Sequence, residues 1–569
     1  MDPTSTNQPA AQRRARKKSK GPGQDIARGA AIIAALTILS RILGLGRTLV
    51  FSQSVGAGCL GTAYATANQV PSLIYEVAIG GALTSAMVPV LARSAERAAR
   101  DPQAEERVAR ITSALLTWAV LILVPLTVVI AVAAGPVASF LNPVNPNARC
   151  PHPQMISDTA QLLVAFAPQV FLYGVSVVLF GLLQAYRRFT GPALAPVIAN
   201  VVLISCYLAF IPTDGGRGFL ATPASAMLLL GLGTTANIAA LVLVPAVPAW
   251  RLRLKIRPAL KFPPGVARQA GGLVLVGLIE FVAQDVLSVV VIAVANGHGD
   301  TGALVLATYQ MQVFNAMYGV LAVSIVTSVF PVLSSRDGTA FDRVSAGSTR
   351  AVLLVSWLGT ALIAAIAVPA AHVLARQDDQ VPQLVWAFAL AAPGVAGMGV
   401  VTNLSRVMFV LGRLKMAAVA LAGISVVALA LDLLVPVLAP PRWVVPGIAA
   451  SVTIAATVVA IPVVRAIRRI RGPAAVAGAV RANLTGIAAA AAASAAGIAV
   501  SLAIPADRRL VYGGSAVVAA LAAIVVFAAV AFALDKDDLR AIARRFRRSR
   551  KPLSLTDRGD SPRYHGNDD

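Results

Sequence analysis

The chain contains 569 residues, of which 57% are hydrophobic and only 13% are charged, and its mean hydropathy is +0.75. A soluble domain carries about 25% charged residues, so this composition argues against a soluble enzyme, a disordered scaffold and a nucleic-acid-binding protein. The net charge of +24 is therefore interpreted by its location along the chain rather than as a footprint of nucleic acid.

Fourteen apolar stretches are long enough to cross about 30 Å of hydrocarbon. We predict an all-α integral membrane protein with about 14 transmembrane helices. The predicted spans have approximate centres at Leu39, Ala78, Leu123, Tyr173, Val201, Leu232, Val282, Gly319, Leu362, Met398, Val426, Ala456, Ala492 and Val525.

Positive charge alternates between successive connections. If the N-terminus lies inside, the basic connections all fall on the cytoplasmic side, and each exterior connection holds at most two arginines. The basic connections are 92–110, 186–190, 250–268, 334–350, 412–415 and 465–481. A miscount of one helix would invert every later loop, so the pattern predicts a multi-pass protein of the plasma membrane with both termini cytoplasmic.

The first span carries two arginines, Arg41 and Arg47, in the segment SRILGLGRTLV. A charge at the bilayer centre costs about 2.5–3.5 kcal/mol on insertion scales, so such residues face a cavity or a partner. A guanidinium group binds phosphate through a bidentate fork, which favours a cationic cavity wall that holds a phosphate-bearing headgroup. The alternative is that one arginine extends its head to the membrane interface.

Further polar residues lie in the second, seventh and eighth spans. The candidates for lining a substrate cavity are Asn68, Gln69, Glu76 and Gln312, and those for a cavity acid or ion coupling are Glu280 and Asp285. Polar faces on corresponding spans of the two halves predict one shared cavity. In the alternative, Glu280 and Asp285 pair with arginines and only hold the bundle together.

Two more candidates lie in the eleventh and twelfth spans, where Asp432 and Thr453 offer oxygen ligands for a cation. Hydrogen bonding between helices is the alternative role. Cys59 and Cys150 both fall in exterior connections, so a disulfide between them is permitted, with two free thiols as the alternative. Cys206 lies in an apolar span and is interpreted as core.

Short sequence echoes indicate an internal repeat. TSAMVPVLAR (84–93) resembles TSVFPVLSSR (327–336), and the fourth and tenth spans share a proline-containing pattern around Pro168 and Pro393. Both halves then face the same way, an arrangement typical of transporters. We predict a disordered basic cytoplasmic tail (1–28), a six-helix lobe (29–249), a cytoplasmic linker (250–268), a second, parallel six-helix lobe (269–470), two extra helices (478–534) and a cytoplasmic tail (535–569).

Enzyme signatures are missing from the sequence. It contains no GxxxxGK[ST] phosphate loop, no HExxH and no GxSxG motif, and its four histidines are scattered. We therefore predict a transporter without ATP hydrolysis, metal or cofactor. Its driving force would be the membrane potential or a monovalent cation gradient.

Four ordered blocks carry a family resemblance: SRILGLGRTLVFSQSVGAG (40–58), QVPSLIYEVAIGGALTSAMVPVLAR (69–93), APQVFLYGVSVVLFGLLQAYRRFTGPALAPVIANV (167–201) and YGVLAVSIVTSVFPVLSS (318–335). They resemble the MviN/MurJ lipid II flippases of bacterial peptidoglycan synthesis, over about residues 30–535. The resemblance implies a bundle of the multidrug/oligosaccharidyl-lipid/polysaccharide exporter type. Spans 1, 2, 7 and 8 would line a cationic cavity, and the last two helices would form a groove for the lipid tail.

The family's essential first-span arginines correspond to Arg41 and Arg47. The family's second-span arginine pair falls on Tyr75 and Glu76, and its eighth-span arginine falls on Gln312. The acidic residue that usually follows the second arginine is Thr48. These departures reduce the positive charge of the implied cavity.

The sequence thus predicts a flippase that moves lipid II to the outer leaflet by alternating access. Its partners would be the lipid-linked saccharide pyrophosphate, membrane lipids and proteins of cell-wall synthesis or division, without nucleic acid. The alternatives are a flippase for another undecaprenyl-linked glycan, a drug exporter of the same superfamily, and a non-transporting scaffold of cell-wall synthesis.

Overall fold

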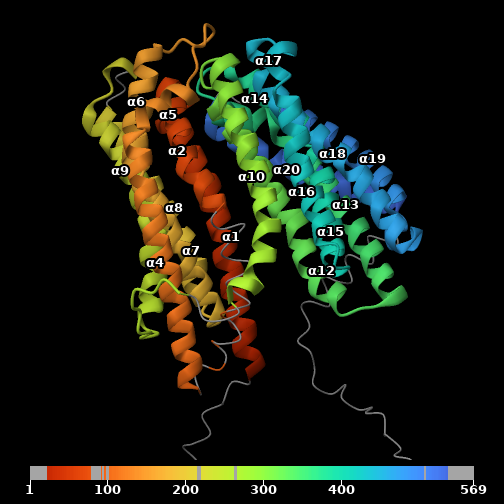
Figure 1. Cartoon of the computed structure of the whole chain (residues 1–569). Coiled ribbons are helices and arrows are strands. Elements are labelled where there is room, and N and C mark those ends of the chain that lie inside the picture. The colour runs from red at the N-terminus through yellow and green to blue at the C-terminus, as the bar shows by residue number, and fades with distance from the viewer. Residues whose placement is uncertain are drawn as a thin grey trace, which may run out of the picture. The chain divides into compact units, whose positions relative to one another are not determined.

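The computed structural model describes residues 22–77, 91, 95, 97, 101–214, 219–261, 266–504 and 508–535. Across these ranges every regular element is a helix (Figure 1). The predicted tails lie outside them except at their inner ends, because α1 begins at Pro22 and the description ends at residue 535. Most of the repeat segment 84–93 also lies outside.

In the part of the chain that is described, 13 helical segments are long and apolar enough to cross a membrane. The remaining predicted span is centred at Ala78, which lies outside the described residues, and α2 (Cys59–Val77) covers only the part before it. The prediction of an all-α membrane protein with about fourteen spans is confirmed.

The chain divides into two compact units, residues 1–305 and 306–569. In the first unit α1 packs against α8, α2 against α6, and α4 against α7, while α9 contacts α6, α7 and α8. Its helices are α1 (Pro22–Ser54), α2 (Cys59–Val77), α4 (Pro102–Val132), α5 (Ala134–Leu141), α6 (His152–Phe166), α7 (Pro168–Ala185), α8 (Thr190–Asp214), η3 (Phe219–Ala221), α9 (Ala224–Trp250) and α10 (Val266–His298). Although the sequence predicts that α10 opens the second lobe, its contacts in the first unit are with α2 and α5.

The described part of the predicted linker, up to residue 261, lies along α4. The backbone N–H of Arg257 donates to Ser113 Oγ and that of Ala259 to Thr117 Oγ1, both at 3.1 Å. Trp118 Nε1 donates to Leu260 O, also at 3.1 Å. These hydrogen bonds satisfy backbone and side-chain groups of a non-helical segment on the side of a helix.

The second unit comprises the rest of α11 (Ala303–Tyr318) and the elements after it. These are η4 (Gly319–Val323), α12 (Ser324–Ser334), α13 (Gly338–Leu374), α14 (Gln380–Ala391), α15 (Gly394–Val410), α16 (Leu414–Asp432), α17 (Val435–Leu438), η5 (Pro441–Trp443), α18 (Val444–Arg471), η6 (Pro473–Val476), α19 (Ala479–Ala503) and α20 (Arg509–Leu534). η4 is a π-helical turn inside the eighth span. Such turns interrupt regular helices and are frequent at functional sites.

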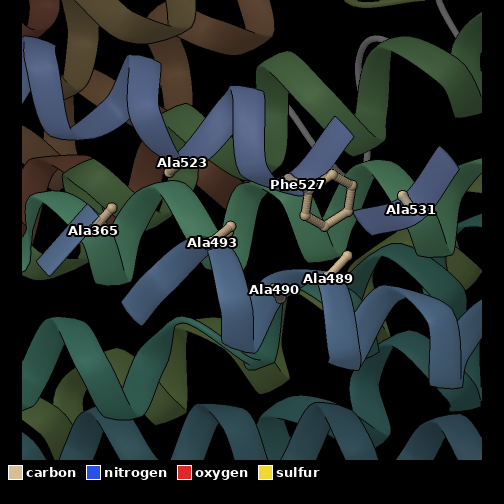
Figure 2. Packing of buried hydrophobic residues seen from close by; sticks show 8 residues of the cluster. Ala365, Ala489, Ala490, Ala493, Ala523, Phe527 and Ala531 are labelled. Carbon is tan, nitrogen blue, oxygen red and sulfur yellow. The ribbon is translucent and has the colours of Figure 1, made fainter. Parts of the chain in front are cut away.

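The last two helices pack on α13 through small side chains (Figure 2). Ala361 and Ala365 of α13 lie in one buried cluster with alanines of α19 and α20 and with Phe527. Small residues let helices approach closely in lipid, where van der Waals packing replaces the hydrophobic effect as the driving force.

The fourth and tenth spans are both interrupted at the prolines that the repeat places in equivalent positions. α6 ends at Phe166 before Pro168, and α14 ends at Ala391 before Pro393. A proline cannot donate the backbone hydrogen bond that would continue the helix, so carbonyl oxygens before it need other donors.

A threonine from another helix supplies that donor in each unit. Thr235 Oγ1 of α9 donates to Ala165 O at 2.7 Å. Thr453 Oγ1 of α18 lies 2.6 Å from Leu390 O and 3.1 Å from Ala391 O. The two halves therefore use the same device at the same place in their sequence order.

Candidate functional site

The two arginines of α1 have different surroundings. Arg41 is exposed, whereas Arg47 is partly buried. Arg47 interacts electrostatically with Tyr64, Tyr173 and Tyr207, which belong to α2, α7 and α8. Arg47 is therefore the arginine that reaches towards the interior of the first unit, where partial burial lowers the effective dielectric constant and strengthens its interaction with an anion.

A buried set of hydroxyl groups lies near Arg47. Tyr64 Oη is 2.8 Å from both Tyr207 Oη and Thr234 Oγ1. The ring of Phe51 on α1 packs 5.2 Å from each of the two tyrosine rings. These contacts join α1, α2, α8 and α9 and fix the part of α1 that follows Arg47.

The polar side of α2 continues from this set. Asn68 and Gln69 are partly buried and Glu76 is exposed. Ser72 Oγ donates to Asn68 O at 2.9 Å, and the Tyr75 ring lies 4.1 Å from the Tyr173 ring. Tyr75 occupies a position where the family resemblance implies an arginine, so an aromatic contact with α7 replaces a positive charge there.

α10 brings a second carboxyl group towards the first. Asp285 is partly buried, its Oδ1 has no hydrogen-bond partner among the described residues, and it interacts electrostatically with Glu76. Glu280, one turn earlier, is partly buried as well. The first unit thus places Glu76 within electrostatic range of Asp285, and the Tyr75 ring contacts that of Tyr173, which interacts electrostatically with Arg47.

The other candidates belong to the second unit. Gln312 on α11 is partly buried next to the buried Gln310. Asp432 at the end of α16 is fully buried, and Ser451 of α18 lies beside it. The Ser451 hydroxyl donates to Gly447 O at 3.0 Å, which leaves both carboxylate oxygens of Asp432 without a partner.

The expected pairing of Thr453 with Asp432 is not what the structure shows. The Thr453 hydroxyl is directed at the carbonyl oxygens of the tenth span, and Ser451 takes the position next to Asp432. Two residues separate these positions, which is a turn of about 200° on an α-helix, so they point to nearly opposite sides of α18.

The two exterior cysteines form a disulfide. Cys59 and Cys150 are joined with a Cα–Cα distance of 5.6 Å, while Cys206 is free and buried. Close by, Asn145 Nδ2 donates to Asn296 O at 2.7 Å and to Gly299 O at 2.8 Å. The loop after α5 is thus attached both to the start of α2 and to the end of α10.

The family model described as lipid II flippase MurJ matches residues 51–502. The chain belongs to this family. Its members are transporters rather than enzymes, and this protein is accordingly a multi-pass membrane protein.

Curated members of the family match parts of the chain. The lipid II flippase MurJ of Burkholderia cenocepacia is 27% identical over 180 residues, which cover 32% of this chain and 33% of that protein. The probable lipid II flippase MurJ of Synechocystis sp. is 28% identical over 253 residues, covering 43% of this chain and 44% of the relative. The chain therefore aligns with less than half of the length of these relatives.

Solved structures share the fold over a longer range. A lipid II flippase MurJ in an inward closed conformation matches with a TM-score of 0.69 at 16% identity, covering 89% of this chain and 99% of that chain. An inward-facing multidrug resistance transporter of the MATE family matches with a TM-score of 0.61 at 12% identity, covering 78% and 98%. At these identities the likeness establishes the fold.

Several residues of this site are absent from the sequence-based predictions. Tyr64, Tyr173, Tyr207 and Thr234 lie in spans that read as ordinary apolar helices. A buried tyrosine in a span usually needs a hydrogen-bond partner for its hydroxyl group. Tyrosines at similar depths in different spans could therefore have indicated this set of hydroxyl groups. Nothing in the sequence distinguishes Ser451 from other serines in apolar spans.

Proposed function

We propose that this protein moves lipid II, the lipid-linked peptidoglycan precursor, from the inner to the outer leaflet of the bacterial plasma membrane by alternating access. The observation that carries the proposal is the position of Arg47 in a chain of the MurJ family. Arg47 extends from α1 into a polar, partly buried region made by α2, α7 and α8. A guanidinium group in that environment suits the pyrophosphate of a lipid-linked saccharide.

The roles that we propose for the individual residues follow from the exposure and charge of their side chains. Arg47 holds the pyrophosphate, and the more exposed Arg41 captures it at the entrance of the region. In the first unit, Asn68 and Gln69 offer amide groups that hydrogen-bond the saccharide and peptide, and in the second unit Gln312 offers the same kind of group. The amide side chains bind polar groups without adding charge, which suits a large headgroup that must also be released.

The test compares Arg47→Gln and Arg47→Lys with Arg469→Gln in cells depleted of the native protein. We expect both Arg47 variants to lower the outward appearance of lipid II more than tenfold, because truncating a buried charge pair costs about 2–5 kcal/mol and lysine lacks the bidentate fork. Arg469 is exposed on α18, so its variant keeps wild-type transport at equal abundance. Wild-type transport by Arg47→Gln would refute the proposal.

The driving force in this proposal is the membrane potential or a monovalent cation. Asp432 is the candidate for cation binding, because its buried carboxylate has two unpartnered oxygens and a neighbouring hydroxyl at Ser451. Oxygen ligands of this kind suit a hard cation. Transport by Asp432→Asn that keeps the cation dependence of the wild type would remove Asp432 from this role.

One observation favours a second candidate substrate, another undecaprenyl-linked glycan. Glu76 and Asp285 interact electrostatically in a region where the family resemblance implies additional positive charge. A less positive site suits a headgroup with fewer anionic groups. Mass spectrometry of the lipid that accumulates in the inner leaflet after depletion distinguishes the two substrates.

A further inference from the structure

The second unit contains an open groove that no part of the proposed transport site uses. Its volume is about 630 Å³, and it lies between α13, α15, α18 and α19. α20, although it is packed on α19, does not contribute to it. This arrangement differs from the tail groove that the family resemblance assigns to the last two helices together.

The walls of the groove are apolar and open to lipid. Val400 and Ile461 line one side, and Leu484 and Ile487 line the other. The side chains of Ile461, Leu484 and Ile487 are 47%, 61% and 41% exposed, respectively. In a membrane protein these exposed faces contact acyl chains.

Trp357 of α13 forms the floor. Its Nε1 donates to Asn483 Oδ1 at 2.9 Å, which holds the indole ring between α13 and α19. Gly486 leaves space for this ring, because a Cβ at that position would overlap Trp357. The position of the indole ring is therefore set by the packing of α13 against α19.

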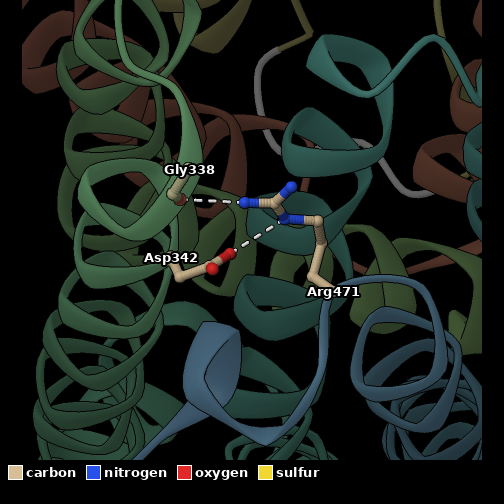
Figure 3. A network of polar contacts seen from close by, with 3 residues as sticks. All are labelled: Gly338, Asp342 and Arg471. Atoms are coloured by element: carbon tan, nitrogen blue, oxygen red, sulfur yellow. Dashed lines mark hydrogen bonds and ion pairs between the residues drawn. The ribbon is translucent and has the colours of Figure 1, made fainter.

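Two arginines without acidic partners stand at one end of the groove. Arg465 and Arg468 line it and are exposed, and in the described ranges neither has a carboxylate within 4.0 Å. Two other arginines in this part of the chain are paired with carboxylates. Arg471 Nε donates to Asp342 Oδ1 at 2.9 Å (Figure 3), and Arg481 lies 3.4 Å from Asp535.

The depth of the groove matches one leaflet. Along α18 it runs from Thr457 to Arg468. At 1.5 Å per residue this distance is about 16 Å, roughly half of the ~30 Å hydrocarbon core. The arginines lie at the end that the distribution of positive charge predicts to be cytoplasmic.

We propose that this groove binds an anionic phospholipid of the cytoplasmic leaflet, with an acyl chain over Trp357 and the phosphate on Arg465 and Arg468. Unpaired arginines above an apolar groove of one-leaflet depth complement a lipid that joins a phosphate to a chain of that length. The polyprenyl tail of a lipid-linked saccharide is longer than one leaflet and would lie mostly outside. The proposal concerns a resident lipid and does not depend on which substrate is transported.

The experiment uses the full chain reconstituted in vesicles that contain phosphatidylglycerol or phosphatidylcholine with brominated acyl chains. Bromine quenches tryptophan fluorescence at contact, and the difference between the wild type and Trp357→Phe isolates Trp357 from the other four tryptophans. We expect brominated phosphatidylglycerol to quench Trp357 at a lower mole fraction than brominated phosphatidylcholine.

Two kinds of variant distinguish the effect of the arginine charges from that of the shape of the groove. Arg465→Gln and Arg468→Gln each lower the preference for phosphatidylglycerol about fivefold, and the double variant abolishes it. Arg469→Gln is the matched control, because Arg469 is exposed on the same helix but does not line the groove. Ala460→Phe fills the groove below the arginines and reduces quenching by both lipids.

Three outcomes overturn the proposal: equal quenching by the two lipids in the wild type, an unchanged preference in the double variant, or unchanged quenching in a folded Ala460→Phe variant. Relief of quenching by a small amount of polyprenyl diphosphate saccharide would identify the substrate tail as the occupant and overturn it too. No substrate is otherwise present, so these results leave the lipid II proposal unaffected.

Discussion

Arg41 and Arg47 show how two identical side chains on one helix acquire different surroundings. Only six positions separate them, yet Arg47 interacts with three tyrosines from other helices while Arg41 remains exposed. The sequence identifies both as costly charges in a span, because that cost depends only on hydropathy and length. Which of them faces the interior depends on where α2, α7 and α8 lie.

We expect the hydroxyl group of Tyr64 to contribute to the free energy of unfolding. Replacing it by phenylalanine removes the hydroxyl that reaches both Tyr207 and Thr234. Thr234 keeps its hydrogen bond to Leu230 O, but the Tyr207 hydroxyl loses its partner. We expect Tyr64→Phe to lower the free energy of unfolding by about 1–3 kcal/mol, measured by thermal unfolding in detergent.

Tyr512→Phe is the control for this substitution. The Tyr512 ring stacks on His372 at 4.3 Å, and this contact does not involve the hydroxyl. Its unfolding midpoint should match that of the wild type. Equal midpoints for both variants would show that the Tyr64 hydroxyl contributes nothing to stability.

At the scale of elements, the fourth and tenth spans are interrupted at corresponding prolines, so the internal repeat of the sequence is also present in the structure. Thr235 and Thr453 each satisfy carbonyl oxygens before a proline break. We expect Thr235→Val and Thr453→Val each to destabilise the protein by about 0.6–2 kcal/mol, the range of hydrogen bonds between membrane helices. Because the sites lie in different units, their effects on the free energy of unfolding should add.

The control for the threonine variants is Thr457→Val, since Thr457 is exposed and donates within its own helix to Thr453 O at 2.8 Å. It should leave the unfolding midpoint close to that of the wild type. A Thr453→Val variant as stable as Thr457→Val would contradict the proposed role of these hydroxyls at the breaks.

The disulfide connects elements that are distant in sequence. Cys59 and Cys150 are 91 residues apart, and closing a loop of that length restricts the unfolded chain by roughly 4–5 kcal/mol in the chain-entropy account. We expect Cys59→Ser/Cys150→Ser to lower the unfolding midpoint and reducing agent to have the same effect on the wild type. Cys206→Ala should remain sensitive to reducing agent; insensitivity of the wild type would exclude the bond.

At the scale of the whole molecule, we propose that the charge of the substrate couples its transport to the membrane potential. Moving one elementary charge through 100 mV corresponds to about 2.3 kcal/mol, which is at most about fiftyfold in rate. In liposomes, an inside-negative potential should speed outward movement of lipid II, and the reversed potential should slow it. A rate independent of imposed potential, in the absence of cation gradients, would exclude this driving force.

The charge of the first unit is also relevant to which substrate we propose. Tyr75 and Glu76 occupy positions where the family resemblance implies arginines, and Asp285 adds a second carboxyl near Glu76. The sequence shows that these residues depart from the family pattern. Only the packing of α10 beside α2 shows that the two carboxyl groups influence each other electrostatically.

The sequence by itself determined the membrane-spanning character, the approximate number of spans, the predicted orientation and the family blocks. These follow from hydropathy, charge and residue order, which are properties of short segments and need no knowledge of their neighbours. The equivalence of Pro168 and Pro393 belongs to the same class, because proline interrupts a helix wherever it occurs.

The tertiary structure alone decided which polar groups meet. It joined Tyr64 to Tyr207, brought Ser451 rather than Thr453 beside Asp432, connected Cys59 to Cys150, and left the groove above Trp357 open. Each of these depends on helix rotation and on contacts between segments far apart in the chain. A rotation of one residue, about 100° on an α-helix, is invisible to hydropathy but changes which atoms are in contact.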